Sequence, residues 1–524
     1  MIDAFHSVAP RAADRAPGRI HAVRYALIAC LAVVSALSGC AGESTTRLRD
    51  GGPVTSAPIS VFPLGHYDQN VDRWIDPRSP NYDVPFLAAD VQRAQFAALS
   101  DRYFGAAPDD PSPWNPAYIG RQVYANGGKD IVALQEQRFA RFDNSDKPGR
   151  LVGYGMNFRA HTRAWIDAIA RNVDAGQFTR ANSYDASRRA IATTTLPVRE
   201  LPTLDPSFYD YRIAGEGYPF DNLQVSAVRP GTPLYMLGTS ADGSWSYVQT
   251  PDVQGWVRSD GVASVDDAFV HTWRVASRGR LGVVVAASVP VRDDRGVYRF
   301  DAPAGTLLPL QPASTAGNAG MLVPARNPDG QAVIRTATLD ASDVAIAPLT
   351  ATPRHLATLL KALIGRPYGW GNTNFDNDCS SELQSIFAAF GVWLPRHSST
   401  QMSAGHMIDL SQSTPAERLD YLSRHGEAMH TLVYIGGHVM LYLGNASVDG
   451  HVVPIVYQDI WGLRPADDSL RAVVGGSVIL PLLPRYPEDP DLESLAATPT
   501  FEISILGMPV TGAPEPEQGE NPAG

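Results

Sequence analysis

Short apolar runs that alternate with polar residues fill the middle of the chain, a pattern that predicts strands rather than helices. Two such runs lie at 228–235 and 242–248, and a Gly-Trp-Val run follows at 255–257. The second run opens on an Asp-Gly pair, which is typical of a tight turn between paired strands. We therefore predict a small β domain over 191–270.

A weaker copy of this pattern runs from about 275 to 349. Its Val-Pro-Val-Arg at 289–292 repeats the Leu-Pro-Val-Arg at 196–199. This repeat predicts a second β domain over 271–350. Neither copy carries a stripe of basic residues, so each is expected either to pack and position other domains or to bind a ligand directly.

Helical spacing appears on both sides of these β segments. Apolar residues recur every three or four positions at 91–103 and 158–173, which predicts a mainly helical N-terminal domain over 59–190. The last folded domain is expected at 351–486. Residues 487–524 are rich in Pro, Gly and Glu toward their end, and we expect a largely disordered tail there. The fold class is therefore multi-domain α+β.

The N-terminus has the pattern of an export signal. Residues 1–39 contain a basic region and an apolar run of about thirteen residues, shorter than the roughly 20 that a membrane-spanning helix needs. The run ends in Leu-Ser-Gly before Cys40, which resembles the bacterial lipoprotein signal. That resemblance implies a lipid anchor on Cys40 and a place in the cell envelope, at the periplasmic face of the outer membrane. The alternative is an ordinary signal peptide with an incidental cysteine. Residues 40–58 look like a flexible tether.

The amino-acid composition excludes several kinds of partner and site. The 524 residues include 43 Lys and Arg against 54 Asp and Glu, a net charge of -11 that argues against nucleic acid as a partner. Three cysteines exclude a disulfide framework and a cysteine-rich zinc site, and the chain has no metal-binding or nucleotide-binding motif, so we expect no cofactor. Removal of the signal leaves Cys40 and Cys379. A lone thiol in an exported protein needs a chemical explanation.

Cys379 lies where a helix is expected to begin. Apolar residues at Leu383, Ile386, Phe387 and Phe390 predict an amphipathic helix, and Asp378 or Asn377 is a natural N-cap. The positive end of the helix dipole and its free N–H groups favour a thiolate nucleophile and also stabilise an oxyanion. The alternative is a small buried apolar residue. The polar neighbours of Cys379 favour catalysis.

A nucleophilic thiol needs a base, and His438 is the candidate. It starts a predicted strand at 438–443, and a turn at 445–450 followed by a second strand would place Gln458 or the residue before it opposite His438. The Gln458 amide oxygen would then accept from Nδ1–H of the imidazole. His451 would lie roughly 20 Å away along the hairpin, and Asp459 is the alternative orienting residue.

Four ordered motifs, at 367–371, 378–381, 394–401 and 437–444, together resemble the NlpC family of papain-like cysteine peptidases, which act on bacterial cell-wall peptides. The resemblance covers about 352–485. The two β domains resemble bacterial SH3-like barrels, as in one multi-domain branch of that family. In that branch the extra domains shape or partly cover the active-site cleft.

The resemblance implies a catalytic triad of Cys379, His438 and Gln458, although the third position is often histidine. It also implies substrate contacts from Tyr368, Asp378, Ser380 and Ser398, with Asp378 suited to the free amine of an N-terminal L-Ala and the tyrosine hydroxyl to the oxyanion. The implied reaction is hydrolysis of the bond between γ-D-Glu and a diamino acid (diaminopimelate) in peptidoglycan stem peptides. The alternatives are a non-catalytic peptidoglycan-binding lipoprotein and the same thiol chemistry on another amide.

Overall fold

The computed structural model of the protein describes residues 61–145, 153–210, 213, 215–311, 317–448, 450–466 and 471–508. The predicted signal, Cys40 and the tether lie outside these residues. Among the residues described, no helix is both long enough and apolar enough to cross a bilayer.

The N-terminal region is helical, as predicted. Thr162 caps α6 by accepting from the backbone N–H of Trp165, so this helix begins later than the spacing alone indicated. Apolar residues of α5 and α6 pack against buried aromatic residues of the first β domain. The helices are α2 (Val71–Trp74), α3 (Ala89–Phe104), α4 (Pro116–Gln122), α5 (Lys129–Phe142), α6 (Arg163–Val173) and α7 (Gln177–Arg180).

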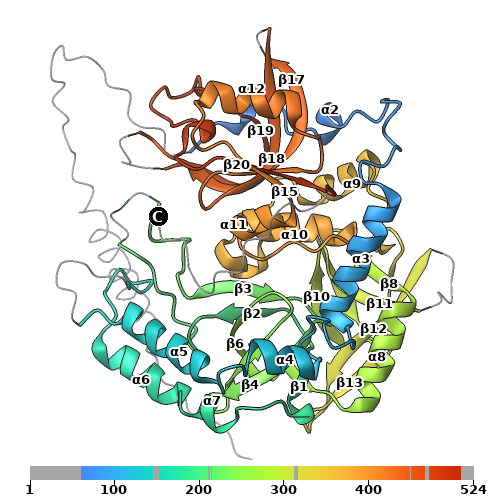
Figure 1. The fold of residues 1–524 in the computed structure, drawn as a ribbon, viewed down its shortest axis with the longest axis vertical. Helices are drawn as coiled ribbons and strands as arrows, with labels where there is room; N and C mark the ends of the chain where they lie inside the picture. Colours follow the sequence, from blue (N-terminus) through green and yellow to red (C-terminus); the bar gives the residue numbers. More distant parts are fainter. Residues whose placement is uncertain are drawn as a thin grey trace, which may run out of the picture. The chain divides into compact units, whose positions relative to one another are not determined.

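The first β domain is a sheet of seven antiparallel strands in the order β3-β2-β6-β5-β4-β1-β7 (Figure 1). The expected Asp-Gly turn joins β4 to β5, and Gly243 adopts the left-handed conformation there. The strands are β1 (Arg189–Ala192), β2 (Leu196–Arg199), β3 (Gln224–Val228), β4 (Pro233–Thr239), β5 (Trp245–Gln249), β6 (Gln254–Arg258) and β7 (Val262–Ser264).

Helix α8 (Asp267–Gly279) leads into the second β domain, which has a two-stranded sheet (β10-β9) and a five-stranded sheet (β13-β12-β11-β8-β14). The repeated Val-Pro-Val-Arg lies in β9, as its counterpart lies in β2. The strands are β8 (Leu281–Val284), β9 (Ser288–Arg292), β10 (Tyr298–Pro303), β11 (Leu307–Gln311), β12 (Asn318–Arg326), β13 (Ala332–Asp340) and β14 (Val344–Ile346).

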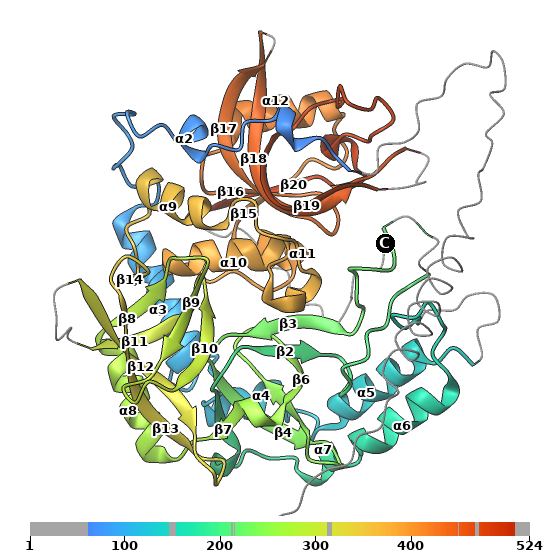
Figure 2. The same ribbon diagram turned by 180° about the vertical axis from the view of Figure 1, so that it is seen from behind.

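The C-terminal domain is built on a six-stranded antiparallel sheet in the order β15-β20-β16-β17-β18-β19. Helix α10 covers one face of this sheet and α12 the other (Figures 1 and 2). Its helices are α9 (Pro353–Leu363), α10 (Cys379–Ala389), α11 (Ser398–Gln401) and α12 (Pro415–His425). Its strands are β15 (Gly405–Asp409), β16 (Thr431–Tyr434), β17 (Val439–Val448), β18 (His451–Leu463), β19 (Ala472–Pro481) and β20 (Glu502–Leu506).

Strand β20 corrects the expectation of a disordered tail from residue 487. It pairs with β15 on one side and with β16 on the other, so it lies inside the sheet. Ile503 and Ile505 are buried, and the backbone groups of both neighbouring strands gain partners. The composition of residues 487–524 did not indicate this strand, because its five residues are few compared with the Pro, Gly and Glu residues around them.

The first β domain contacts the loop that precedes α10. The Gln224 side chain of β3 donates to the Gly371 carbonyl at 2.9 Å. Gly371 has φ +59°, and a Cβ atom there would lie 2.5 Å from the Gln224 carbonyl oxygen. Glycine is therefore required at this position both by the backbone conformation and by the close approach of β3.

Candidate active site

Cys379 is the first residue of α10, as the sequence predicted. Asp378 caps the helix by accepting from the backbone N–H of Ser381, whose hydroxyl accepts in return from the backbone N–H of Asp378. The thiol is 7% exposed, and its sulfur accepts from the backbone N–H of Val439. Since Val439 directly follows His438, this contact brings the start of α10 to the start of β17.

The expected thiolate is not the resting state of this cysteine. Burial, followed by the neighbouring Asp378 carboxylate, raises the pKa of Cys379 to about 12, and the hydrogen bond from Val439 only partly offsets them. The helix N-terminus favours ionisation, but removal of the sulfur from water outweighs it. The thiol is therefore protonated near neutral pH and needs a base at the moment of attack.

His438 is oriented by Gln458, although not through the expected nitrogen. Its Nε2 lies 2.7 Å from the Gln458 Oε1 atom, where Nδ1 had been expected. An amide oxygen can only accept, so the imidazole proton lies on Nε2, and Nδ1 keeps the lone pair that a general base needs. Burial lowers the pKa of His438 to about 4, so the ring is neutral near pH 7.

The hairpin that carries these residues has a different register from the predicted one. Strand β17 continues to Val448, which pairs with His451 at the far end of the hairpin, so the turn is much shorter than 445–450. Gln458 still reaches His438 because β18 is long and a bulge between Tyr442 and Gly444 shifts the pairing.

Within the described part of the chain, neither of the two alternative orienting residues forms a hydrogen bond with the imidazole. His451 lies at the turn end of the hairpin, as the distance estimate predicted. Both carboxyl oxygens of Asp459 are buried without a hydrogen-bond partner in the described structure. Burial and the neighbouring Glu382 carboxylate raise the pKa of Asp459 well above its ordinary value, which favours the neutral carboxyl.

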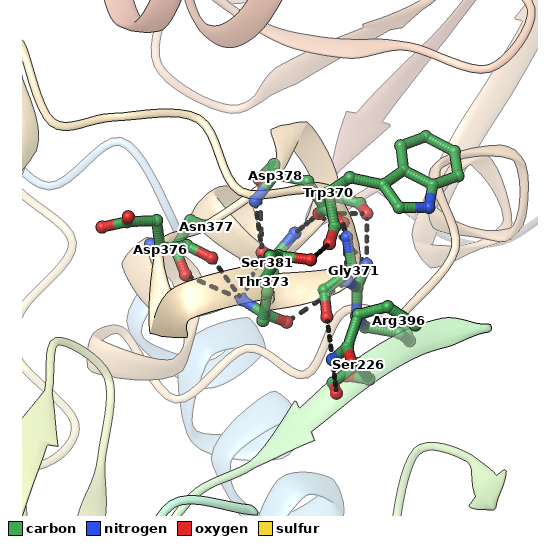
Figure 3. Close-up of polar contacts among 12 residues, drawn as sticks. Ser226, Trp370, Gly371, Thr373, Asp376, Asn377, Asp378, Ser381 and Arg396 are labelled. Carbon is green, nitrogen blue, oxygen red and sulfur yellow. Dashed lines mark hydrogen bonds and ion pairs between the residues drawn. The ribbon is translucent and has the colours of Figure 1, made fainter. Parts of the chain in front are cut away.

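A buried ion pair supports the start of α10 (Figure 3). The Arg396 guanidinium donates to both oxygens of Asp378, at 3.1 and 2.6 Å, and it also donates to Ser226 of β3 at 2.8 Å. Burial alone would raise the pKa of Asp378, but Arg396 and the hydrogen bonds with Ser381 hold it below the ordinary value. Asp378 is therefore ionised and held in place.

The Asp378 carboxylate has little capacity left for a substrate amine. It accepts five hydrogen bonds, from the Gly371 and Ser381 backbones, the Ser380 hydroxyl and twice from Arg396. A carboxylate offers about four lone-pair sites. The structure thus gives Asp378 a structural partner in Arg396, and the amine-binding role that the resemblance implied stays a prediction.

The remaining predicted contacts gather around the thiol. A pocket of about 680 Å³, part of it open to solvent, contains Cys379 and is bounded by the C-terminal domain, the first β domain and α5. The predicted residues Tyr368, Asp378, Ser380 and Ser398 all line it. The other lining residues are Arg141, Asn222, Gln224, Val225, Trp370, Gly371, Arg396, His397 and Gly437.

Several residues of this site were given no role by the sequence. Arg396 lies inside a recognised motif, at 394–401, and an arginine in such a motif could have been read as a partner for Asp378. Glu382, buried in α10, accepts from Tyr457, Ser477 and Asn377 and so holds the helix on the sheet. Gln224 and Arg141 had no local signal because they come from other domains.

Family models match three segments of the chain. An SH3 domain of the SH3b1 type matches 206–258, an SH3 domain of the SH3b2 type matches 266–315, and the NlpC/P60 family matches 365–461. The last match contains Cys379 and His438. This chain carries an NlpC/P60 domain. Two SH3-like domains precede it, which confirms the predicted resemblance and fold class.

Known relatives agree with this assignment. A solved NlpC/P60 endopeptidase from Photobacterium damselae subsp. piscicida is 25% identical with a TM-score of 0.72, covering 87% of this chain and 99% of that one. A probable endopeptidase of Mycobacterium tuberculosis is 31% identical over 93 residues, which is 18% of this chain and 23% of that protein. A gamma-D-glutamyl-L-lysine dipeptidyl-peptidase of Bacillus cereus is 26% identical over 98 residues, 18% and 29% of the two chains. The chain thus spans less than a third of the length of these curated relatives.

Proposed function

We propose that this protein is a cysteine endopeptidase that hydrolyses the bond between γ-D-Glu and diaminopimelate in peptidoglycan stem peptides. The observation that carries the proposal is a thiol at a helix N-terminus, inside a pocket, whose sulfur accepts from the backbone N–H of the residue that follows the Gln458-oriented His438. The NlpC/P60 match supports the class of reaction. The name of the Bacillus cereus relative supports the γ-D-glutamyl linkage.

The geometry supports the following sequence of steps. His438 Nδ1 accepts the proton as the Cys379 sulfur attacks the γ-carbonyl, because both groups are neutral at rest. The carbon–nitrogen bond then breaks, His438 donates its proton to the leaving amine, and a thioester remains. Water, activated by the now neutral imidazole, attacks the thioester, releases the carboxylate and returns a proton to the sulfur.

The oxyanion of each tetrahedral intermediate needs hydrogen-bond donors. The first turn of α10 supplies free backbone N–H groups beside the sulfur. Tyr368 lines the same pocket, and burial, followed by the nearby Cys379, raises its pKa well above the ordinary value. Its hydroxyl therefore keeps its proton and remains a donor. We assign Ser380 and Ser398 to hydrogen bonds with the peptide.

Mass spectrometry of stem peptides tests this function. The protein is incubated with the tetrapeptide L-Ala-γ-D-Glu-diaminopimelate-D-Ala, and we expect the dipeptide L-Ala-D-Glu and the released diaminopimelate-D-Ala. Unchanged peptide, with the Cys379 thiol shown by titration to be reduced, would contradict the proposal. Cleavage of a different bond would support the role of the thiol but contradict the proposed specificity for the γ-D-glutamyl bond.

The pH dependence of this reaction follows from His438. Because the imidazole must be neutral to accept the thiol proton, we expect kcat/KM to stay level down to about pH 5 and to reach half its maximum near pH 4. Burial lowers the pKa of His438 in the folded state below its unfolded value of about 6.5. The stability of the folded state therefore also declines as the pH falls from about 6.5 toward 4. Circular dichroism must accompany each rate measurement. An acid limb between about pH 6 and 7 in the folded protein would contradict the expectation.

We also propose that a lipid on Cys40 anchors the protein in the cell envelope, at the periplasmic face of the outer membrane. This proposal rests on the sequence pattern of residues 1–40. A Cys40→Ser variant is expected to move from the detergent-extracted membrane fraction to the aqueous fraction, while its peptide cleavage in solution stays unchanged. An unchanged membrane fraction would contradict the anchor.

A further inference from the structure

One charged residue of the pocket comes from the N-terminal helical region, for which the proposed reaction assigns no role. Arg141 lies in the last turn of α5 and lines the pocket that contains Cys379. This arginine is far from the NlpC/P60 domain in the sequence. Its side chain is 27% exposed, so a molecule in the pocket can reach it.

Two neighbouring side chains hold the Arg141 guanidinium in place. It donates to the Tyr209 hydroxyl at 2.7 Å and lies 3.8 Å from the Glu200 carboxylate. Arg138, one turn earlier in α5, lies 3.8 Å from the same carboxylate. The Glu200 carboxylate thus lies near two guanidinium groups and helps to hold the Arg141 side chain at the edge of the pocket.

The other side chains of the pocket that can carry a positive charge are bound inside the protein or neutral. Arg396 is bound to Asp378 through both of its terminal nitrogens. Burial lowers the pKa of His397 to about 4, so this ring is uncharged near neutral pH. Among the residues that line the pocket, Arg141 is the cation best placed to bind an anionic part of the substrate.

We propose that Arg141 is a specificity-determining residue that binds the free α-carboxylate of the D-Glu residue. This inference rests on the proposed function. A glutamate linked through its γ-carboxyl keeps its α-carboxylate on the acyl side of the bond, separated from the reacting carbonyl by its Cα, Cβ and Cγ atoms. The same pocket is lined by Tyr368, assigned above to the oxyanion, and by Ser380 and Ser398, assigned above to the peptide. A planar guanidinium matches a carboxylate with two parallel hydrogen bonds.

The test compares two peptides that differ in one group. One is L-Ala-γ-D-Glu-diaminopimelate, and the other carries D-isoglutamine, whose α-carboxamide has no charge. We expect the wild-type protein to prefer the carboxylate peptide by about 10- to 100-fold in kcat/KM. In Arg141→Met this preference is expected to fall close to one, through loss on the carboxylate peptide with little change on the amide. Arg141→Lys keeps the positive charge but lacks the planar guanidinium. Its preference for the carboxylate peptide is expected to lie between those of the wild type and Arg141→Met.

Arg138→Met is the matched control. It removes an arginine from the same helix and from the same Glu200 contact, but Arg138 does not line the pocket, so the preference should persist. Equal losses on both peptides in Arg141→Met would mean a structural role and overturn the inference, and so would a wild-type protein that cleaves both peptides equally. A wild-type protein that cleaves neither peptide would instead overturn the proposed function, and this inference with it. Thermal unfolding of each variant shows that it is folded.

Discussion

Replacement of Cys379 by alanine is expected to reduce kcat for stem-peptide cleavage by at least about 10⁴-fold, because no other group in the pocket can form the thioester. The fold should survive, since the change removes one buried atom and one hydrogen bond from Val439, a cost of about 1 kcal/mol. The rate is measured by mass spectrometry of the released peptides. Cys40→Ser, which changes the other cysteine that remains after removal of the signal, is the control and should cleave soluble peptide at the wild-type rate.

The same variant separates catalysis from simple binding. Peptide affinity of Cys379→Ala, measured by calorimetry, should remain close to that of the wild type, because binding energy comes from the rest of the pocket. Residual cleavage at more than about a hundredth of the wild-type rate would contradict the role of Cys379. Binding by both proteins without cleavage by either would favour the alternative of a non-catalytic peptidoglycan-binding lipoprotein.

Replacement of Arg396 by leucine is expected to destabilise the folded state by about 3–5 kcal/mol and to lower Tm by about 10 °C. The arginine is 4% exposed and Asp378 9%, so the variant leaves a carboxylate buried without its counter-charge. The hydrogen bond to Ser226 is lost as well. Differential scanning calorimetry measures the change.

Two variants show whether this loss comes from the unpaired charge. Asp378→Asn combined with Arg396→Leu removes both charges, and asparagine also caps helices, so stability should partly return. Arg366→Leu removes the partner of Asp376 in an exposed pair and should cost no more than about 1 kcal/mol. A loss below about 1 kcal/mol in Arg396→Leu alone would contradict the structural role assigned to the buried pair.

The sequence predicted those parts of the site that depend on near neighbours. Cys379 was placed at the start of α10 because an N-cap residue and a helical apolar spacing identify a helix end locally. Gln458 was selected although the predicted register was wrong, since its strand follows that of His438 in a hairpin. The ionisation of Cys379 was wrong because a helix dipole is a local property, whereas burial depends on every segment packed around the sulfur.

By itself, the sequence determined the order of the domains and the elements that carry the proposed nucleophile and base, because helix caps, spacing and turns are set by residues a few positions apart. Only the tertiary structure decided that β20 lies inside the sheet, that Arg396 neutralises Asp378 and that Arg141 lines the pocket. These contacts join residues that are distant along the chain. They form because strand edges need partners and buried charges need counter-charges, and no local pattern records where either is found.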